Sequence, residues 1–140
     1  MNQKILKLII GVGLTLLLIG CGTSGKTSIA GKVAQNGKQV TNNKVTLVMT
    51  VDGKDGETRD AQTDANGQFV FEDVQPGTYY LLTAIVTQGN SGCSTSSPGF
   101  GVLSMTTNKG IISMASNSDK PFTVKDGAGR MTKDIAFRCK

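Results

Sequence analysis

Thiols are the most reactive groups of this chain, because its 140 residues include three cysteines and no histidine. The cysteines are Cys21, Cys93 and Cys139. Without histidine, a serine or cysteine nucleophile lacks its usual base, and a thiolate metal site lacks ligands to complete it. We therefore expect a non-enzymatic protein without a metal site or cofactor. A serine–lysine catalytic pair is the alternative that the sequence leaves open.

A phosphate-binding pattern, Gly-x-x-x-x-Gly-Lys-Thr, occupies residues 20–27. That motif works where a buried strand leads into a helix, whose N-terminal amides surround the phosphates. Here an apolar run precedes the pattern and an alternating, strand-like segment follows it. We therefore expect a flexible tether and no nucleotide. Lysines are scattered along the chain and aromatic residues are few, so a nucleic-acid partner is not expected either.

Acidic residues between Asp52 and Asp64 suggest a cation-binding loop at first sight. Their spacing does not follow the Asp-x-Asp/Asn-x-Asp/Asn-Gly pattern of calcium loops, and Lys54 and Arg59 intrude among them. We interpret these acids as parts of solvated turns.

The first 20 residues have the pattern of an export signal. Two lysines and no acid precede residue 8, and residues 8–19 are apolar apart from two glycines and a threonine. A dozen residues rise only about 18 Å as a helix, well short of the roughly 30 Å of bilayer hydrocarbon. Residues 1–20 are therefore predicted to form a cleaved signal helix.

The end of this segment, Leu18-Ile19-Gly20-Cys21, resembles the bacterial lipobox. The resemblance implies cleavage before Cys21 and a diacylglyceryl group on its sulfur, so that residues 21–27 become a lipid-anchored tether. The protein is then expected to be exported and held on the membrane. In a cell with two membranes, Gly22 in place of Asp implies the outer one. An ordinary signal peptide followed by a chance cysteine is the alternative.

Export changes what is expected of Cys93 and Cys139. Thiols in an oxidising compartment are usually paired, so we predict a disulfide between these two residues. Free thiols are the alternative, and a metal-binding pair is a weaker one. The bond would fasten the C-terminus to a Gly/Ser-rich loop.

Short alternating segments follow one another at intervals of roughly ten residues, separated by Gly, Asn and Asp. This spacing is typical of a β-sandwich, and no segment has the period of a helix. We predict one all-β domain of about seven strands over residues 28–140. The expected strands are residues 28–34, 44–51, 57–63, 68–72, 78–87, 122–125 and 132–137.

Four segments carry a resemblance to a known family: residues 29–33, 44–47, 63–71 and 74–81. Their Asp-Ala-Asn-Gly-Gln-Phe-Val-Phe and Pro-Gly-Thr-Tyr-Tyr-Leu motifs resemble the carboxypeptidase regulatory-like domain. That family is transthyretin-like, a seven-stranded sandwich of the immunoglobulin-like kind. The resemblance covers residues 28–87 well, and it implies a scaffold without implying an activity.

Residues 88–119 depart from the family pattern. They are rich in Ser, Gly, Thr and Asn, and we interpret them as an inserted hairpin. Phe100, Val102, Leu103 and Met105 are the candidate binding surface if they are exposed. The alternative is that these four side chains cover the sandwich.

Together these features predict a cell-envelope lipoprotein that acts as a non-catalytic binding or structural module. Its partners would be the membrane, through the lipid anchor, and an unknown envelope protein. The alternative is a carbohydrate-binding module for wall or extracellular glycan. Glycan binding usually needs exposed planar aromatics, and this chain has no Trp. Tyr79 and Tyr80 are adjacent on one strand, so one of them must face inward.

Overall fold

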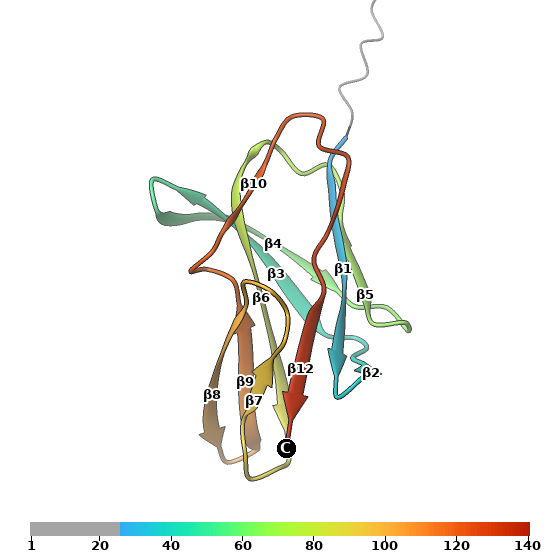
Figure 1. Cartoon of the computed structure of the whole chain (residues 1–140), viewed down its shortest axis with the longest axis vertical. Coiled ribbons are helices and arrows are strands. Elements are labelled where there is room, and N and C mark those ends of the chain that lie inside the picture. The colour runs from blue at the N-terminus through green and yellow to red at the C-terminus, as the bar shows by residue number, and fades with distance from the viewer. Residues whose placement is uncertain (1–25) are drawn as a thin grey trace, which may run out of the picture.

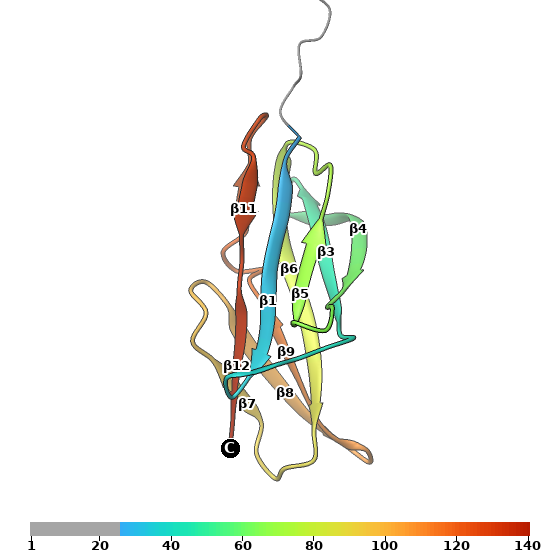
Figure 2. The same ribbon diagram turned by 90° about the vertical axis from the view of Figure 1, so that its right-hand side faces the viewer.

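The computed structural model describes residues 26–140 and contains two β-sheets packed face to face, with no helix among those residues (Figures 1 and 2). The predicted all-β sandwich is confirmed. The predicted signal helix, residues 1–20, lies outside the described residues.

The first sheet is organised around its longest strand, β1, which pairs along both edges. On one edge β1 runs parallel to β11 and β12, and β7 follows beyond β12. On its other edge β1 runs antiparallel to β2 and β5. The strands of this sheet are β1 (Ser28–Gln35), β2 (Lys38–Gln39), β5 (Gln68–Phe71), β7 (Cys93–Thr95), β11 (Arg130–Thr132) and β12 (Ile135–Cys139).

The last strand is interrupted between β11 and β12, and a side-chain hydrogen bond to β1 bridges the interruption. At the break the Asp134 carboxylate accepts a hydrogen bond of 3.0 Å from the backbone amide of Lys32. The carbonyl of Lys133 approaches Gly31 so closely that a Cβ at that position would overlap it. Glycine at position 31 therefore allows the two strands to meet.

The second sheet has the order β4-β3-β6-β9-β8, and β10 pairs with the first residues of β6. All of its pairs are antiparallel. Its strands are β3 (Lys44–Val51), β4 (Lys54–Gln62), β6 (Gly77–Thr87), β8 (Gly101–Thr107), β9 (Gly110–Ser116) and β10 (Phe122–Val124).

Turn residues with positive φ join several strands, as the sequence predicts. Asn36 and Gly37 connect β1 to β2 with φ of 50° and 80°, and Asp52 and Gly53 connect β3 to β4 with φ of 52° and 73°. Asn, Asp and Gly adopt this left-handed region most readily, which makes them suited to tight hairpins.

The predicted hairpin within residues 88–119 is present as β8 and β9, but it is not an appendage to the sandwich. β9 pairs with β6 over six residues, from Leu82↔Ser116 to Thr87↔Ile111. The hairpin therefore widens the second sheet and leaves β8 as its edge strand.

The core lies between the sheets and is made of the inward-facing residue of each alternating pair. The first sheet contributes Ile29, Val33, Phe69, Phe71, Ile135 and Phe137, all buried. The second sheet contributes Val45, Leu47, Tyr79, Leu81, Ile85, Ala115 and Val124, also buried. Alternation of buried and exposed residues is what the sandwich requires of its strands.

Candidate functional site

The disulfide between Cys93 and Cys139 is present. It joins two residues that are directly opposite in the β7–β12 pair, so that the last residues of the chain are tied to the loop before β7. The predicted pairing is confirmed, and the alternatives of free thiols or a metal-binding pair do not hold. The predicted lipidation site, Cys21, lies outside the described residues.

The four residues predicted as a binding surface separate into two pairs. Phe100 and Val102 are partly buried and pack against the hydrophobic core. Leu103 and Met105 are 68% and 54% exposed. Alternate residues of a strand face opposite sides of the sheet. Leu103 and Met105 therefore face one side of β8, and Val102 faces the other. Leu103 and Met105 are therefore the two exposed members of the predicted surface.

Leu103 and Met105 belong to a larger patch on the outer face of the second sheet. Leu103 is paired with Met114, and Met105 with Ile112, in the β8–β9 ladder. The patch continues across β9 onto the outward residues of β6. We call it the apolar outer face, and it consists of Leu82, Ala84, Val86, Leu103, Met105, Ile112 and Met114.

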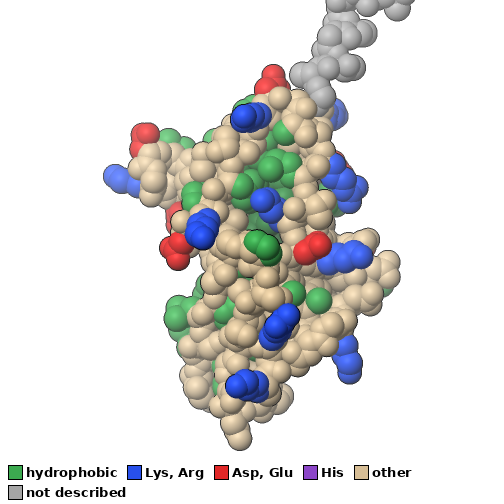
Figure 3. All heavy atoms as spheres, viewed as in Figure 1, with side chains coloured by type: hydrophobic (Ala, Val, Ile, Leu, Met, Phe, Trp, Pro, Cys, Tyr) green, Lys and Arg blue, Asp and Glu red, His purple; other side chains and the backbone are tan. Residues whose placement is uncertain are grey.

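The apolar outer face contains no charged residue. β6, β8 and β9 carry no Asp, Glu, Lys or Arg, and none occurs anywhere between Asp73 and Lys109. Hydrophobic side chains are visible on the side of the molecule where β8 lies (Figure 3). Edge strands of soluble proteins usually carry charges or proline that prevent association. An uncharged edge beside an apolar face is typical of a contact surface.

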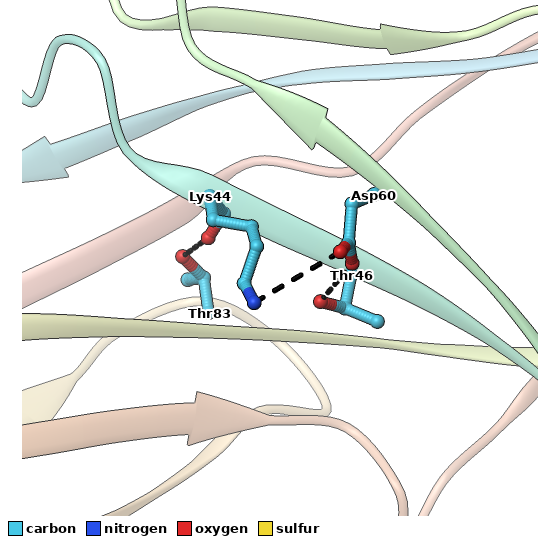
Figure 4. Close-up of polar contacts among 4 residues, drawn as sticks. All are labelled: Lys44, Thr46, Asp60 and Thr83. Atoms are coloured by element: carbon cyan, nitrogen blue, oxygen red, sulfur yellow. Dashed lines mark hydrogen bonds and ion pairs between the residues drawn. The ribbon is translucent and has the colours of Figure 1, made fainter.

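The same outer face becomes polar on β3 and β4 (Figure 4). The Thr46 hydroxyl donates a 2.6 Å hydrogen bond to Asp60, and the Lys44 ammonium lies 3.9 Å from the other oxygen of that carboxylate. The Thr83 hydroxyl donates to the Lys44 carbonyl at 2.7 Å. Thr83 is buried, whereas the Lys44 and Asp60 side chains are exposed, and with Thr46 they form a solvated border to the apolar outer face.

A depression of about 420 Å³ lies where the apolar outer face meets the end of β9. Tyr80 lies on its wall, beside Leu82, and Ser118 and Asp119 contribute polar groups. Partial burial raises the pKa of Tyr80, and the hydrogen bond to Asp55 and the negative charge of that carboxylate raise it further. Tyr80 is half-buried and is the outward-facing member of the tyrosine pair, whereas Tyr79 is buried.

A second pocket, of about 550 Å³, lies beside the loop between β5 and β6, and it shares Asp73, Val74 and Gln75 with a smaller hollow that Lys26 lines. We call it the proximal pocket. Its lining comes from the second half of β3, the first part of β4, the beginning of β6 and the loop between β5 and β6. The lining residues are Leu47, Met49, Val51, Gly56, Glu57, Arg59, Asp73, Val74, Gln75 and Tyr79.

Tyr79 gives the proximal pocket a testable pH dependence. Burial raises the pKa of Tyr79 above its ordinary value of 10.0; the nearby Arg59 opposes the shift and Glu57 adds to it. As the pH rises past 10.0, the unfolded chain loses this proton before the folded chain does. The free energy of unfolding should therefore fall as the pH rises from 10.0 towards the folded pKa.

Urea unfolding between pH 8 and pH 11 should show this loss in the native chain and a weaker one in Tyr79→Phe. At neutral pH the variant should be less stable by about 1 kcal/mol, because the Tyr79 hydroxyl no longer donates its 2.8 Å hydrogen bond to the Gln75 carbonyl. Equal pH slopes for both proteins above pH 10 would show that Tyr79 does not titrate differently in the folded state.

Two features of the site were missed by the sequence interpretation, and one of them has a clear signal. The absence of charge between Asp73 and Lys109 marks the strands of the apolar outer face. The proximal pocket has no comparable signal, because its lining comes from segments that lie far apart in the sequence. Within residues 26–140, no helix is long and apolar enough to cross a membrane. The same residues contain no group of three or more Cys, Asp or Glu side chains placed to hold a metal ion.

Comparison with known proteins supports the sandwich over the first half of the domain. Residues 27–87 match the family profile described as "BOS complex subunit NOMO1-like, second beta sandwich domain". This is nearly the span that resembles the carboxypeptidase regulatory-like domain. No curated protein matches the chain.

Two solved structures are similar to this chain at low identity. One is a Pseudomonas aeruginosa protein whose proposed role is carbohydrate binding, with 17% identity and a TM-score of 0.44; the match covers 85% of this chain and 93% of that one. The other is chlorocatechol 1,2-dioxygenase from Pseudomonas putida, with 10% identity and a TM-score of 0.43. The match covers 83% of this chain and 61% of the dioxygenase, so the chain spans less than two thirds of that enzyme.

Proposed function

We propose that this chain is an exported lipoprotein of the cell envelope, anchored through a lipid on Cys21, whose β-sandwich is a non-catalytic binding module. The membrane holds the N-terminal end, and the domain binds an envelope protein through the apolar outer face. In a cell with two membranes, Gly22 after the lipidated cysteine favours the outer membrane. The lipobox-like residues 18–21 support the anchor.

The observation that carries the binding role is the position and composition of the apolar outer face. Its strands β8 and β9 lie at the end of the sandwich opposite the start of β1 (Figure 1). A domain tethered at Lys26 would hold its anchor at one end and this uncharged surface at the other. Exposed apolar patches bordered by polar groups mark protein contacts, and the Lys44, Thr46 and Asp60 cluster is such a border.

Photo-crosslinking in living cells tests this role. A photoreactive amino acid at position 103 or 105 should form an adduct with the same partner protein. Position 70 is the matched control, because Val70 is 43% exposed and lies on the first sheet. Adducts of equal yield from position 70, or no adduct from 103 and 105, would contradict a protein contact at this face.

A charged residue placed on the apolar outer face should abolish binding of the partner protein, and this is the second expected result. Leu103→Asp should abolish the crosslink from position 105, because desolvating an unpaired carboxylate in an apolar contact is unfavourable. Its stability should stay within about 0.5 kcal/mol of the native chain, since Leu103 is exposed. Val70→Asp, which carries the same charge on the other sheet, should leave the crosslink from position 105 intact.

Carbohydrate binding is the second candidate function, and the depression beside Tyr80 favours it. An accessible tyrosine next to Asp119 and the Ser118 hydroxyl combines a stacking surface with hydrogen-bonding groups. If glycan is the ligand, binding to a glycan array should disappear in Tyr80→Ala and persist in Met105→Asp, because Met105 lies on the apolar outer face but does not line the depression. Array binding that is unchanged by Tyr80→Ala would contradict this candidate.

A further inference from the structure

The proximal pocket is a largely apolar hollow that has no role in the contacts proposed above. On the second sheet, the wall of the pocket is the inner face of the second half of β3. Leu47, Met49 and Val51 alternate along that wall, and Val74 and Tyr79 complete an apolar lining. Its volume of about 550 Å³ falls within the range of roughly 300–1,000 Å³ that is usual for small-molecule sites.

Two hydrogen-bond donors in the lining of the proximal pocket, on Tyr79 and Arg59, already have partners. The Tyr79 hydroxyl donates to the Gln75 carbonyl at 2.8 Å. The Arg59 guanidinium donates to the Glu72 carbonyl at 2.8 Å and lies 5.8 Å from the centre of the Phe71 ring. Because these donors are engaged, a ligand rich in hydroxyl groups would find few free partners there. The lining instead suits a flexible hydrocarbon body.

The place of the pocket in the chain indicates where such a body would come from. Asp73, on the rim, forms an ion pair of 3.5 Å with Lys26, the first described residue. Cys21 precedes Lys26 by five residues, so at most about 18 Å of extended chain separates them. If Cys21 is lipidated as proposed above, the acyl chains begin within that distance of Lys26, whose side chain reaches the rim of the pocket through Asp73.

We propose that the proximal pocket binds a single fatty acyl chain. The acyl chain enters between the β3–β4 hairpin and the loop between β5 and β6, and it lies against Leu47, Met49 and Val74. The polar end of the ligand remains at the mouth, near Arg59 and the Lys26–Asp73 pair. The acyl chain has two available sources, the lipid on Cys21 and a separate membrane lipid. The first source rests on the lipid anchor proposed above.

Photoactivatable palmitic acid supplied to cells that produce the full chain tests the proposal. After irradiation and purification from membranes, mass spectrometry should locate adducts on the lining residues of β3 and on Val74. Val51→Trp should reduce these adducts by at least about fivefold, because a bulky ring at the mouth is a steric block. Val51 is 55% exposed, so the substitution should leave the fold intact, which circular dichroism checks.

The matched control is Val86→Trp, since Val86 is 56% exposed on β6 and belongs to the apolar outer face. It should leave adducts in the proximal pocket unchanged. Adducts confined to the apolar outer face, or a pocket yield that is the same in Val51→Trp and Val86→Trp, would overturn the proposal. Absence of any adduct on the lining residues would overturn it as well.

Cys21→Ser separates the two sources of the chain. Pocket adducts that link to the Cys21 peptide and vanish in this variant identify the protein's own lipid. Pocket adducts that persist in Cys21→Ser identify a separate membrane lipid, and both results support acyl binding. The mass of the N-terminal peptide reports lipidation independently, so failure of the anchor and failure of the pocket are distinguishable.

Discussion

Replacing both disulfide cysteines, in Cys93→Ser/Cys139→Ser, should lower the free energy of unfolding by about 4 kcal/mol according to the chain-entropy treatment. The bond closes a loop with a sequence separation of 46, and it restricts the unfolded chain accordingly. Cys93 is also a buried member of the core. Because a domain of this size has a total stability of roughly 5–15 kcal/mol, the loss is a large share of it.

Urea unfolding of the oxidised native chain and of the double variant measures this difference. Reductant provides the control, since it should destabilise the native chain and leave the double variant unaffected. A decrease of less than about 1 kcal/mol would mean that the unfolded chain gains little freedom when the bond is absent.

Phe137→Ala is the second substitution with a large expected effect. Phe137 is 1% exposed in β12, between Gln35 of β1 and Thr95 of β7. Truncation would remove a buried ring at the middle of the first sheet and leave a cavity that neighbouring strands can close only in part. The free energy of unfolding should fall by about 3–5 kcal/mol.

Val70→Ala is the matched control for this prediction. Val70 lies on the same sheet, in β5, but points outward and is 43% exposed. Its truncation should change the stability by no more than about 0.5 kcal/mol. Denaturant unfolding monitored by circular dichroism gives both values. Similar losses for the two variants would contradict the assignment of Phe137 to the core.

The strands and their turns were predictable because their causes are local. Alternation in residues 44–51 predicts β3 with its observed bounds, and Asn36-Gly37 predicts the turn after β1. Pairing across the sheets depends on contacts between distant residues and was not predictable in the same way. The hairpin within residues 88–119 was expected as an insertion, yet its register with β6 makes β9 a central strand.

The four residues predicted as a possible binding surface differ in exposure, and the difference has a simple origin. Four apolar residues near one another in sequence were treated as one surface, although alternate residues of a strand face opposite sides. Val102 accordingly packs inward, while Leu103 and Met105 remain exposed. The rest of the apolar outer face comes from β6 and β9, and only the fold brings these strands beside β8.

The mass of the N-terminal peptide, measured on protein purified from membranes, tests the central claim most directly. We predict that the chain begins at Cys21 and that this residue carries a diacylglyceryl group, so that the sandwich starting at β1 is held close to the lipid surface. A peptide that begins elsewhere, or an unmodified Cys21 in the membrane fraction, would contradict the account.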